Sequence, residues 1–311
     1  MTDAPQQVLC ALAFLWTLLA FASLIVYVLK RKRPEKDYTE LVLRTKSWWV
    51  MIGVFSIALL ASRTVSLWFL GFMSFLALKE FFSMIPTRRA DRRVLFWAYL
   101  AIPAQYYWAS IEWYGMFIIF IPVYMFLFVA FRMIIAQATE GFLKSAGTIH
   151  WGLMTCVFSL SHMAFLLVLP DIKAGGAGGA GLLLFLVFLT QFNDVAQYVW
   201  GKSFGKHKVL PVVSPKKTWE GLLGGIFTTT VTAMLIAPYL TPFDTLHAAL
   251  AGILIGSFGF VGDVSISAIK RDIGVKDTGT LIPGHGGIMD RIDSLTYTAP
   301  LFFHFTYFFY Y

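Results

Sequence analysis

Long apolar runs alternate with short polar segments along the whole chain. The first run, residues 8–29, holds 22 residues, and at about 1.5 Å per residue it can cross a hydrocarbon core about 30 Å thick. Positive charge follows this run (Lys30 to Arg33) and does not precede it, which favours an uncleaved membrane span over a signal peptide. Apolar runs of this kind predict spanning helices at residues 8–29, 48–61, 64–85, 94–108, 114–133, 151–169, 181–192, 219–238, 246–262 and 295–311.

The basic residues mark one side of the predicted membrane. All but two of the 25 Lys and Arg residues lie in or beside every second connection, and such connections face the cytoplasm under the positive-inside rule. Both chain ends then lie on the outer side. We expect an all-α, polytopic integral membrane helical bundle with about ten (8–10) transmembrane helices.

Composition agrees with a bilayer protein and narrows the function. Hydrophobic residues make up 58% of the chain and charged residues 14%, against roughly a quarter charged in soluble domains. The net charge of +8 arises from the loops, so no nucleic-acid partner is predicted. Cys10 and Cys156 lie in apolar runs and indicate neither a disulfide framework nor a zinc site.

Residues 263–293 concentrate polar chemistry, holding five of the chain's 17 acidic residues. Asp290 and Asp293 are three apart, so on a helix they share a face and can hold a hard divalent cation, with Asp263 as a third ligand. Lys270, Arg271 and Arg291 supply charge for phosphate oxygens. Metal, phosphate and the glycine-rich turn at 283–287 together suggest phosphoryl or nucleotidyl transfer. The alternative interpretation of the acids is a salt-bridge network at the membrane edge.

Three further polar groups lie near the ends of spans. Lys216 and Lys217 precede the run at 219–238, where lysines and free N–H groups form an anion site; the alternative is a positive anchor with Thr218 as a helix cap. Asp194 ends a short apolar run, which makes it a site candidate. Lys79 and Glu80 lie near the inner end of 64–85, where a mutual ion pair or snorkelling would relieve the cost of their charges; an interfacial ion pair is the simpler interpretation, and a catalytic role is the alternative.

The spacing of these residues resembles a known family. The motifs are Ser267-x-Ile269-Lys270-Arg271, Lys276-Asp277-x-Gly279 and Pro283-x-His285-Gly286-Gly287-Ile288-x-Asp290-Arg291-Ile292-Asp293. This pattern is similar to the signature of the phosphatidate cytidylyltransferases, or CDP-diacylglycerol synthases. The segment from Ser214 to Gly221 resembles that family too, so the likeness is close over the C-terminal half.

The resemblance implies an activity and a set of roles. CTP and phosphatidic acid would give CDP-diacylglycerol and pyrophosphate, with Mg²⁺ on Asp290, Asp293 and Asp263, and with a monovalent cation such as K⁺ also allowed. It further implies N-terminal transmembrane helices over residues 1–150 and a catalytic region over 151–311 with cytoplasmic loops 201–218 and 263–293. The catalytic group would be Asp290, Asp293, Asp263, Lys270 and Arg271. The substrate-binding group would be Ser214, Lys216, Lys217, Ser267, Lys276, Asp277, His285, Arg291 and Asp194.

Two departures from the family pattern leave alternatives open. Val195 stands where members commonly have a hydroxyl residue, and Ile266 where they have an acid. A paralogue that uses another lipid phosphate, a lipid transporter and a scaffold without catalysis therefore stay as alternatives. We expect a bacterial inner (cytoplasmic) membrane protein whose site faces the cytoplasm, and a homodimer stays open.

Overall fold

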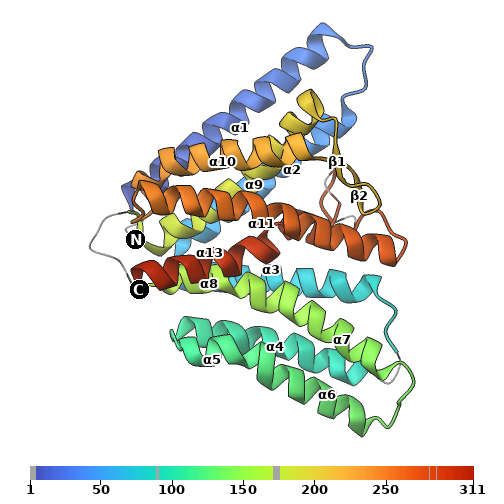
Figure 1. Ribbon diagram of the computed structural model, residues 1–311. Helices are drawn as coiled ribbons and strands as arrows, with labels where there is room; N and C mark the ends of the chain where they lie inside the picture. The colour runs from blue at the N-terminus through green and yellow to red at the C-terminus, as the bar shows by residue number, and fades with distance from the viewer. Residues whose placement is uncertain (1–4, 89–90, 171–175, 280, 285) are drawn as a thin grey trace.

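The fold was analysed in a computed structural model that describes residues 5–88, 91–170, 176–279, 281–284 and 286–311 (Figure 1). The first half contains α1 (Gln6–Lys32), α2 (Thr39–Ala61), α3 (Arg63–Met84), α4 (Arg92–Ser110), α5 (Tyr114–Ile119), the π-helical turn η2 (Phe120–Met125), α6 (Phe126–Ile135) and α7 (Phe142–Leu153). The second half contains the π-helical turn η3 (Met154–Ser159), α8 (Leu160–Val168), α9 (Gly178–Phe204), β1 (Lys208–Leu210), β2 (Ser214–Thr218), α10 (Trp219–Leu240), α11 (Thr245–Asp272), α12 (Met289–Ile292) and α13 (Leu295–Tyr310).

The all-helical membrane fold is confirmed. Each of the ten predicted spans coincides with a helix or with a helix pair joined by a π-helical turn. Within the described residues, eight of these helices are long and apolar enough to cross a membrane. The other two are α4, with 19 residues and Pro103 inside it, and α13, with 16 residues. At about 1.5 Å per residue α13 is shorter than a hydrocarbon core of about 30 Å, so it lies within the bundle without the length of a full span.

Contacts between connections support the predicted alternation of the chain. Arg63, the first residue of α3, forms an ion pair of 2.6 Å with Glu112, which precedes α5, so the α2–α3 and α4–α5 turns lie at the same end of the bundle. Ala177 donates its N–H to the Leu240 carbonyl at 3.3 Å at that end. Both chain termini lie there as well, and the β1–β2 hairpin lies at the opposite end (Figure 1). We call the hairpin end the polar end.

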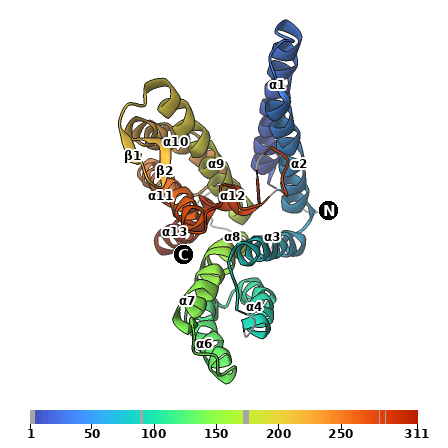
Figure 2. The same ribbon diagram turned by 90° about the vertical axis from the view of Figure 1, so that its right-hand side faces the viewer.

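The helices form three groups around a centre (Figure 2). The groups are α1 with α2, α9 with α10 and α11, and α4 with α6 and α7, while α3, α8 and α13 lie between them. Glycines allow α9, α10 and α11 to approach closely: a Cβ on Gly225 would lie 2.3 Å from the Gln197 side chain, and one on Gly252 would lie 2.6 Å from the Thr230 backbone. Small residues at helix interfaces are typical of membrane proteins, where van der Waals packing holds helices together.

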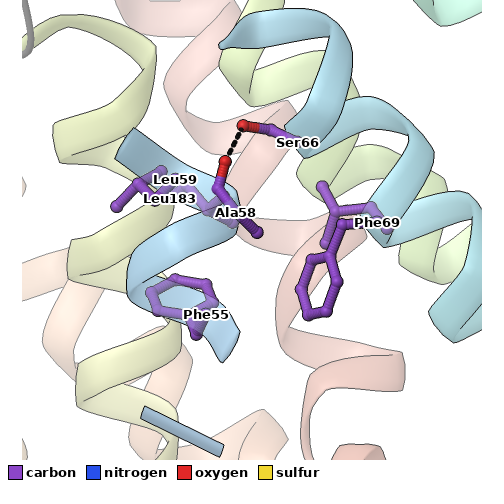
Figure 3. Close-up of a pocket in the computed structure, with 7 residues that line it drawn as sticks. Phe55, Ala58, Leu59, Ser66, Phe69 and Leu183 are labelled. Carbon is purple, nitrogen blue, oxygen red and sulfur yellow. Dashed lines mark hydrogen bonds between the residues drawn. The ribbon is translucent and has the colours of Figure 1, made fainter. Parts of the chain in front are cut away.

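The turn between α2 and α3 is tightly packed and holds no substrate site. The Ser66 hydroxyl donates to the Ala58 carbonyl at 2.7 Å, and a cavity of about 10 Å³ lies beside this bond (Figure 3). Its lining is otherwise apolar, with Phe55, Phe69 and Leu183 around it. Because this volume holds at most about one water molecule, the cavity is a small packing gap.

The predicted loop 201–218 is more ordered than its sequence indicates. The first four residues continue α9, and β1 then pairs antiparallel with β2 through Lys208 opposite Thr218 and Leu210 opposite Ser214. Thr218 caps α10, as its Oγ1 accepts the Gly221 N–H at 3.2 Å, which confirms the capping interpretation. The hairpin therefore fixes Lys216 and Lys217 on a short strand before α10.

Candidate active site at the polar end

Three aspartates from three elements meet at the polar end, and we call them the aspartate cluster: Asp194 of α9, Asp263 of α11, and Asp293 directly after α12. Polar bonds between the helices assemble it. Asn193 and Gln197 donate to the Gly256 carbonyl at 3.2 and 3.3 Å and hold α9 against α11. A Cβ on Gly262 would lie 2.4 Å from the Asp293 carbonyl oxygen, so α11 lies directly against the residues that follow α12.

Lys217 is the cation of the aspartate cluster. Its Nζ lies 2.6 Å from Asp263 Oδ2 and 3.4 Å from Gln197 Oε1. Burial alone would lower the pKa of Lys217, but the charges of Asp263 and Asp194 outweigh burial and raise it, so the ammonium stays charged. This contact brings the predicted substrate residue of β2 together with two of the predicted acids.

The three acids of the aspartate cluster act on one another, and the charge of Arg291 also acts on Asp194 and Asp293. Asp293 is half-buried, and loss of solvation raises its pKa well above the ordinary value; the neighbouring charges of Asp263 and Asp194 raise it further. Asp194 accepts the Ser294 hydroxyl at 3.1 and 3.2 Å, and Asp263 accepts the Ser267 hydroxyl at 3.3 Å. Asp293 Oδ1 accepts the Ser294 N–H at 2.8 Å, so each acid of the cluster has only one or two donors among the described residues.

Asp290 has different partners from Asp293, although only two residues separate them. Its Oδ1 accepts Lys270 Nζ at 2.7 Å, and its Oδ2 accepts the Thr278 N–H, the Thr278 hydroxyl and the Gly287 N–H at 3.0, 2.9 and 3.1 Å. Burial acts to raise the pKa of Asp290, but these bonds outweigh it and lower the pKa. The structure therefore places Asp290 as a fully bonded acceptor that holds the loop between α11 and α12.

Glu80 of α3 also reaches this loop, which the sequence interpretation missed. It accepts the Thr278 hydroxyl, and it accepts the backbone N–H groups of Ile288 and Met289 at 2.9 and 3.0 Å. The ion pair predicted between Lys79 and Glu80 is wrong, since Lys79 is exposed and forms no ion pair in the described part of the chain. The sequence signal for the role of Glu80 was an acidic residue at the end of an apolar run. Its partner Thr278 lies 198 residues further along the chain, so the sequence did not reveal the contact.

The remaining predicted residues lie around these two groups of acids. Ser267, Lys270 and Arg271 lie at the same end of α11 but contact different partners. Ser267 donates to Asp263 and Lys270 to Asp290, whereas Arg271 Nε donates to the Val213 carbonyl of the hairpin at 3.4 Å. Arg291 keeps a buried Nε that has no hydrogen-bond partner among the described residues. Lys216, Lys276 and Asp277 are exposed and Ser214 is half-buried. His285 lies outside the described residues.

The donor chemistry of the aspartate cluster suits a hard divalent cation. In the described ranges no group of three or more His, Cys, Asp or Glu side chains is arranged to hold a metal ion. Mg²⁺, however, is usually bound through one or two carboxylates together with substrate phosphates and waters. Asp263 and Asp293 match that requirement best, because both oxygens of Asp290 already accept donors, namely Lys270 Nζ and the Thr278 and Gly287 N–H groups. The Mg²⁺ ligand set stays a prediction.

The protein is therefore a polytopic membrane protein with a site of carboxylates and lysines at one end of its helices. Sequence comparison identifies its family. The profile of the cytidylyltransferase family matches residues 42–309. The uncharacterized protein YnbB of Escherichia coli (strain K12) is 47% identical over 295 residues, which cover 95% of this chain and 97% of YnbB. The chain therefore belongs to the cytidylyltransferase family, and the resemblance seen in its motifs is confirmed.

Relatives named phosphatidate cytidylyltransferase match a smaller part of the chain. The one from Haemophilus influenzae is 42% identical over 140 residues, covering 42% of this chain and 47% of that protein. The one from Synechocystis is 48% identical over 113 residues, covering 36% of this chain and 38% of that protein. The chain thus spans less than half the length of these two relatives in the matched stretches, and family membership establishes a nucleotidyltransferase without fixing its lipid acceptor.

Proposed function

We propose that this protein transfers a cytidylyl group from CTP to phosphatidate and forms CDP-diacylglycerol and pyrophosphate. The observation that carries the proposal is the aspartate cluster with Lys217, beside the Asp290–Lys270 pair, at the polar end of a chain from the cytidylyltransferase family. A site at the end of membrane helices suits this reaction because CTP is dissolved in water while the acyl chains of the acceptor stay in the bilayer.

The reaction needs no general base. A phosphate oxygen of phosphatidate attacks the α-phosphorus of CTP; the new oxygen–phosphorus bond forms as the bond to the β-phosphate breaks, and its electron pair leaves with pyrophosphate. The attacking oxygen is already anionic near neutral pH, so no proton has to be removed. Catalysis then consists of positioning and of charge stabilisation.

The residues divide these tasks between them. Lys217, Lys270 and Arg291 are charged side chains that bind the phosphates and hold the α-phosphorus in line with the acceptor. Asp263 and Asp293 would bind Mg²⁺, which when present neutralises charge that develops on the phosphate oxygens. Exposed Lys216 and Arg271 lie at the rim and guide the triphosphate to the site by charge.

A second acceptor is a real alternative, and one observation favours it. YnbB matches over nearly its full length, whereas the phosphatidate cytidylyltransferases of Haemophilus influenzae and Synechocystis match about two fifths of the chain or less. The two departures from the family pattern adjoin the aspartate cluster in the sequence: buried Ile266 lies one helical turn after Asp263 on α11, and Val195, which is 53% exposed, directly follows Asp194. The acids and lysines to which we assign CTP binding are all present in the chain, so a different lipid phosphate is the most direct variation.

The test is pyrophosphate release by the purified protein in lipid nanodiscs with CTP and Mg²⁺. Phosphatidate, a polyprenyl phosphate and an acceptor-free blank are compared, and we expect release with phosphatidate. Asp263→Asn and Asp293→Asn should each reduce turnover more than about 100-fold. The matched control is Asp272→Asn, an exposed acid on the same helix, which should stay within about twofold. Absence of release with every lipid phosphate, or wild-type turnover in Asp293→Asn, would overturn the proposal.

Membrane orientation is tested separately. We propose a bacterial inner membrane with the polar end facing the cytoplasm, because the basic connections and the CTP supply lie on that side. In a variant without Cys10, a cysteine at position 272 should resist a membrane-impermeant maleimide in intact spheroplasts, while a cysteine at position 112 should react. The reverse labelling pattern would refute this orientation.

A further inference from the structure

Glu80 links the N-terminal helices to the loop between α11 and α12. Both of its carboxylate oxygens are in use: Oε1 accepts the Thr278 hydroxyl and the Met289 N–H at 3.0 Å, and Oε2 accepts the Ile288 N–H at 2.9 Å. Hydrogen bonds to a charged acceptor are stronger than those between neutral groups. One side chain of α3 therefore fixes the beginning of the loop at Thr278 and its end at Ile288.

Two glycines of the signature are explained by this arrangement. A Cβ on Gly287 would lie 2.0 Å from Glu80 Oε1 and 2.4 Å from the Thr278 hydroxyl. At Gly286 the backbone has a φ of 80°, and a Cβ there would lie 2.6 Å from Asp290 Oδ2. Only residues without a side chain let both carboxylates approach the backbone this closely.

A continuous set of contacts runs from Glu80 to Lys270. The Thr278 hydroxyl lies between Glu80 and Asp290 Oδ2, the latter at 2.9 Å, and its single proton serves one carboxylate at a time. The Thr278 N–H donates to Asp290 at 3.0 Å, and the other oxygen of Asp290 accepts Lys270 Nζ at 2.7 Å. The position of Thr278 therefore determines where Asp290, and with it the ammonium of Lys270, can lie.

We infer that Glu80 is a positioning residue of the transfer site: by fixing Thr278 and the N–H groups of Ile288 and Met289, it holds Asp290 and thereby sets the place of Lys270. The kinetic part of this inference rests on the proposed function, in which Lys270 binds the phosphates of CTP. The catalytic site then includes a structural element from the N-terminal half of the chain.

Glu80→Gln tests the inference without a change of volume. A glutamine keeps one acceptor oxygen but turns its NH₂ group toward backbone N–H donors, so it cannot reproduce the bonds of both oxygens. Lys79→Gln is the matched control, because Lys79 is the exposed neighbour on the same helix. Thr278→Ser, which keeps the hydroxyl, and Thr278→Val, which removes it, address the same set of contacts from the loop side.

The first readout is amide-resolved hydrogen exchange in detergent, which does not depend on turnover. In Glu80→Gln the Ile288 and Met289 amides should exchange about tenfold faster or more, and the Thr278 and Gly287 amides, which donate to Asp290, should follow. Lys79→Gln should match the wild type. Wild-type exchange in Glu80→Gln would overturn the inference whatever the activity.

The second readout separates positioning from general loosening. In Glu80→Gln and Thr278→Val, kcat/KM for CTP should fall about 10- to 100-fold, with KM for the lipid unchanged and with Thr278→Ser close to the wild type. When Glu80→Gln is added to the Lys270→Met variant, kcat/KM for CTP should fall by less than about a further twofold, because both changes remove the same contact. Additive losses would refute action through Lys270. If the wild type releases no pyrophosphate at all, the proposed function fails, and hydrogen exchange alone then decides whether Glu80 holds the loop.

Discussion

Replacement of Lys217 by methionine removes the ammonium from the aspartate cluster while keeping most of the side-chain volume. In the native protein this ammonium lies 2.6 Å from Asp263 and 5.4 Å from the centre of the Phe260 ring. The charges of Asp194 and Asp293 also act on it. After the substitution, the three neighbouring carboxylates lack that cation. We expect Lys217→Met to destabilise the protein measurably, even with no substrate present.

The size of the effect follows from burial. Removal of one partner of a buried ion pair costs roughly 3–5 kcal/mol. The side chains of Lys217 and Asp263 are 22% and 23% exposed, so solvent screens part of this loss and we expect about 2–3 kcal/mol. For a chain of this length, about 2 °C in melting temperature corresponds to 1 kcal/mol, which gives a decrease of about 4–6 °C.

The assay is thermal unfolding in detergent, followed by the fluorescence of the ten tryptophans. Lys216→Met is the matched control: it removes the same charge from the neighbouring residue, which is exposed, and should shift the melting temperature by less than about 1 °C. Adding Asp263→Asn to Lys217→Met should restore part of the loss, because the uncompensated charge is then gone. Equal decreases for Lys216→Met and Lys217→Met would refute the assignment of Lys217 as the cation of the cluster.

Three further predictions concern the same end of the molecule. The folded-state pKa of Asp293 is raised, so its ionised form lowers the stability of the folded protein, and this cost is absent below the unfolded pKa and grows as the pH rises through the folded pKa. Asp293→Asn should therefore have a higher melting temperature than the wild type at pH 8, and the difference should shrink in acid. The same variant should lose pyrophosphate release. Gly287→Ala places a Cβ 2.0 Å from Glu80 Oε1 and should lower turnover about 100-fold or more, whereas Gly147→Ala, whose Cβ meets nothing within 4 Å, should leave it unchanged in the same assay. Chelation with EDTA should stop pyrophosphate release and added Mg²⁺ should restore it, and turnover that persists in EDTA would contradict the metal prediction.

Hydropathy located the membrane helices because a bilayer leaves the backbone few choices. Every N–H and C=O in the hydrocarbon region needs an internal partner, so each apolar run of sufficient length becomes a helix. The ends of the helices were harder to predict. The run at 181–192 becomes α9, which continues to Phe204, because Asn193 and Gln197 find the Gly256 carbonyl as a partner and the polar end of the helix can be buried.

The members of the site were visible in the sequence, but their partners were not. Composition and motif spacing selected Asp194, Asp263, Lys270 and Asp293, because such residues are rare next to apolar runs. Helical spacing suggested that Asp290 and Asp293 act together, yet α12 ends at Ile292 and the two carboxylates take separate partners. The partners depend on contacts between elements that are far apart in the sequence, and such contacts leave no pattern in the local sequence.

The two groups of acids differ in how well their oxygens are satisfied, and this difference assigns their roles. Asp290 accepts three donors of its own and Glu80 two, and the Thr278 hydroxyl serves one or the other; such carboxylates stabilise a loop, because the donors offset the cost of burying the charge. The aspartate cluster has three carboxylates but one close lysine, an arrangement that costs stability and is typical of a site that binds a cationic or metal-bound ligand. We therefore expect substitutions at Glu80 and Asp290 to loosen the loop, and substitutions at Asp263 and Asp293 to abolish transfer in a protein that still folds.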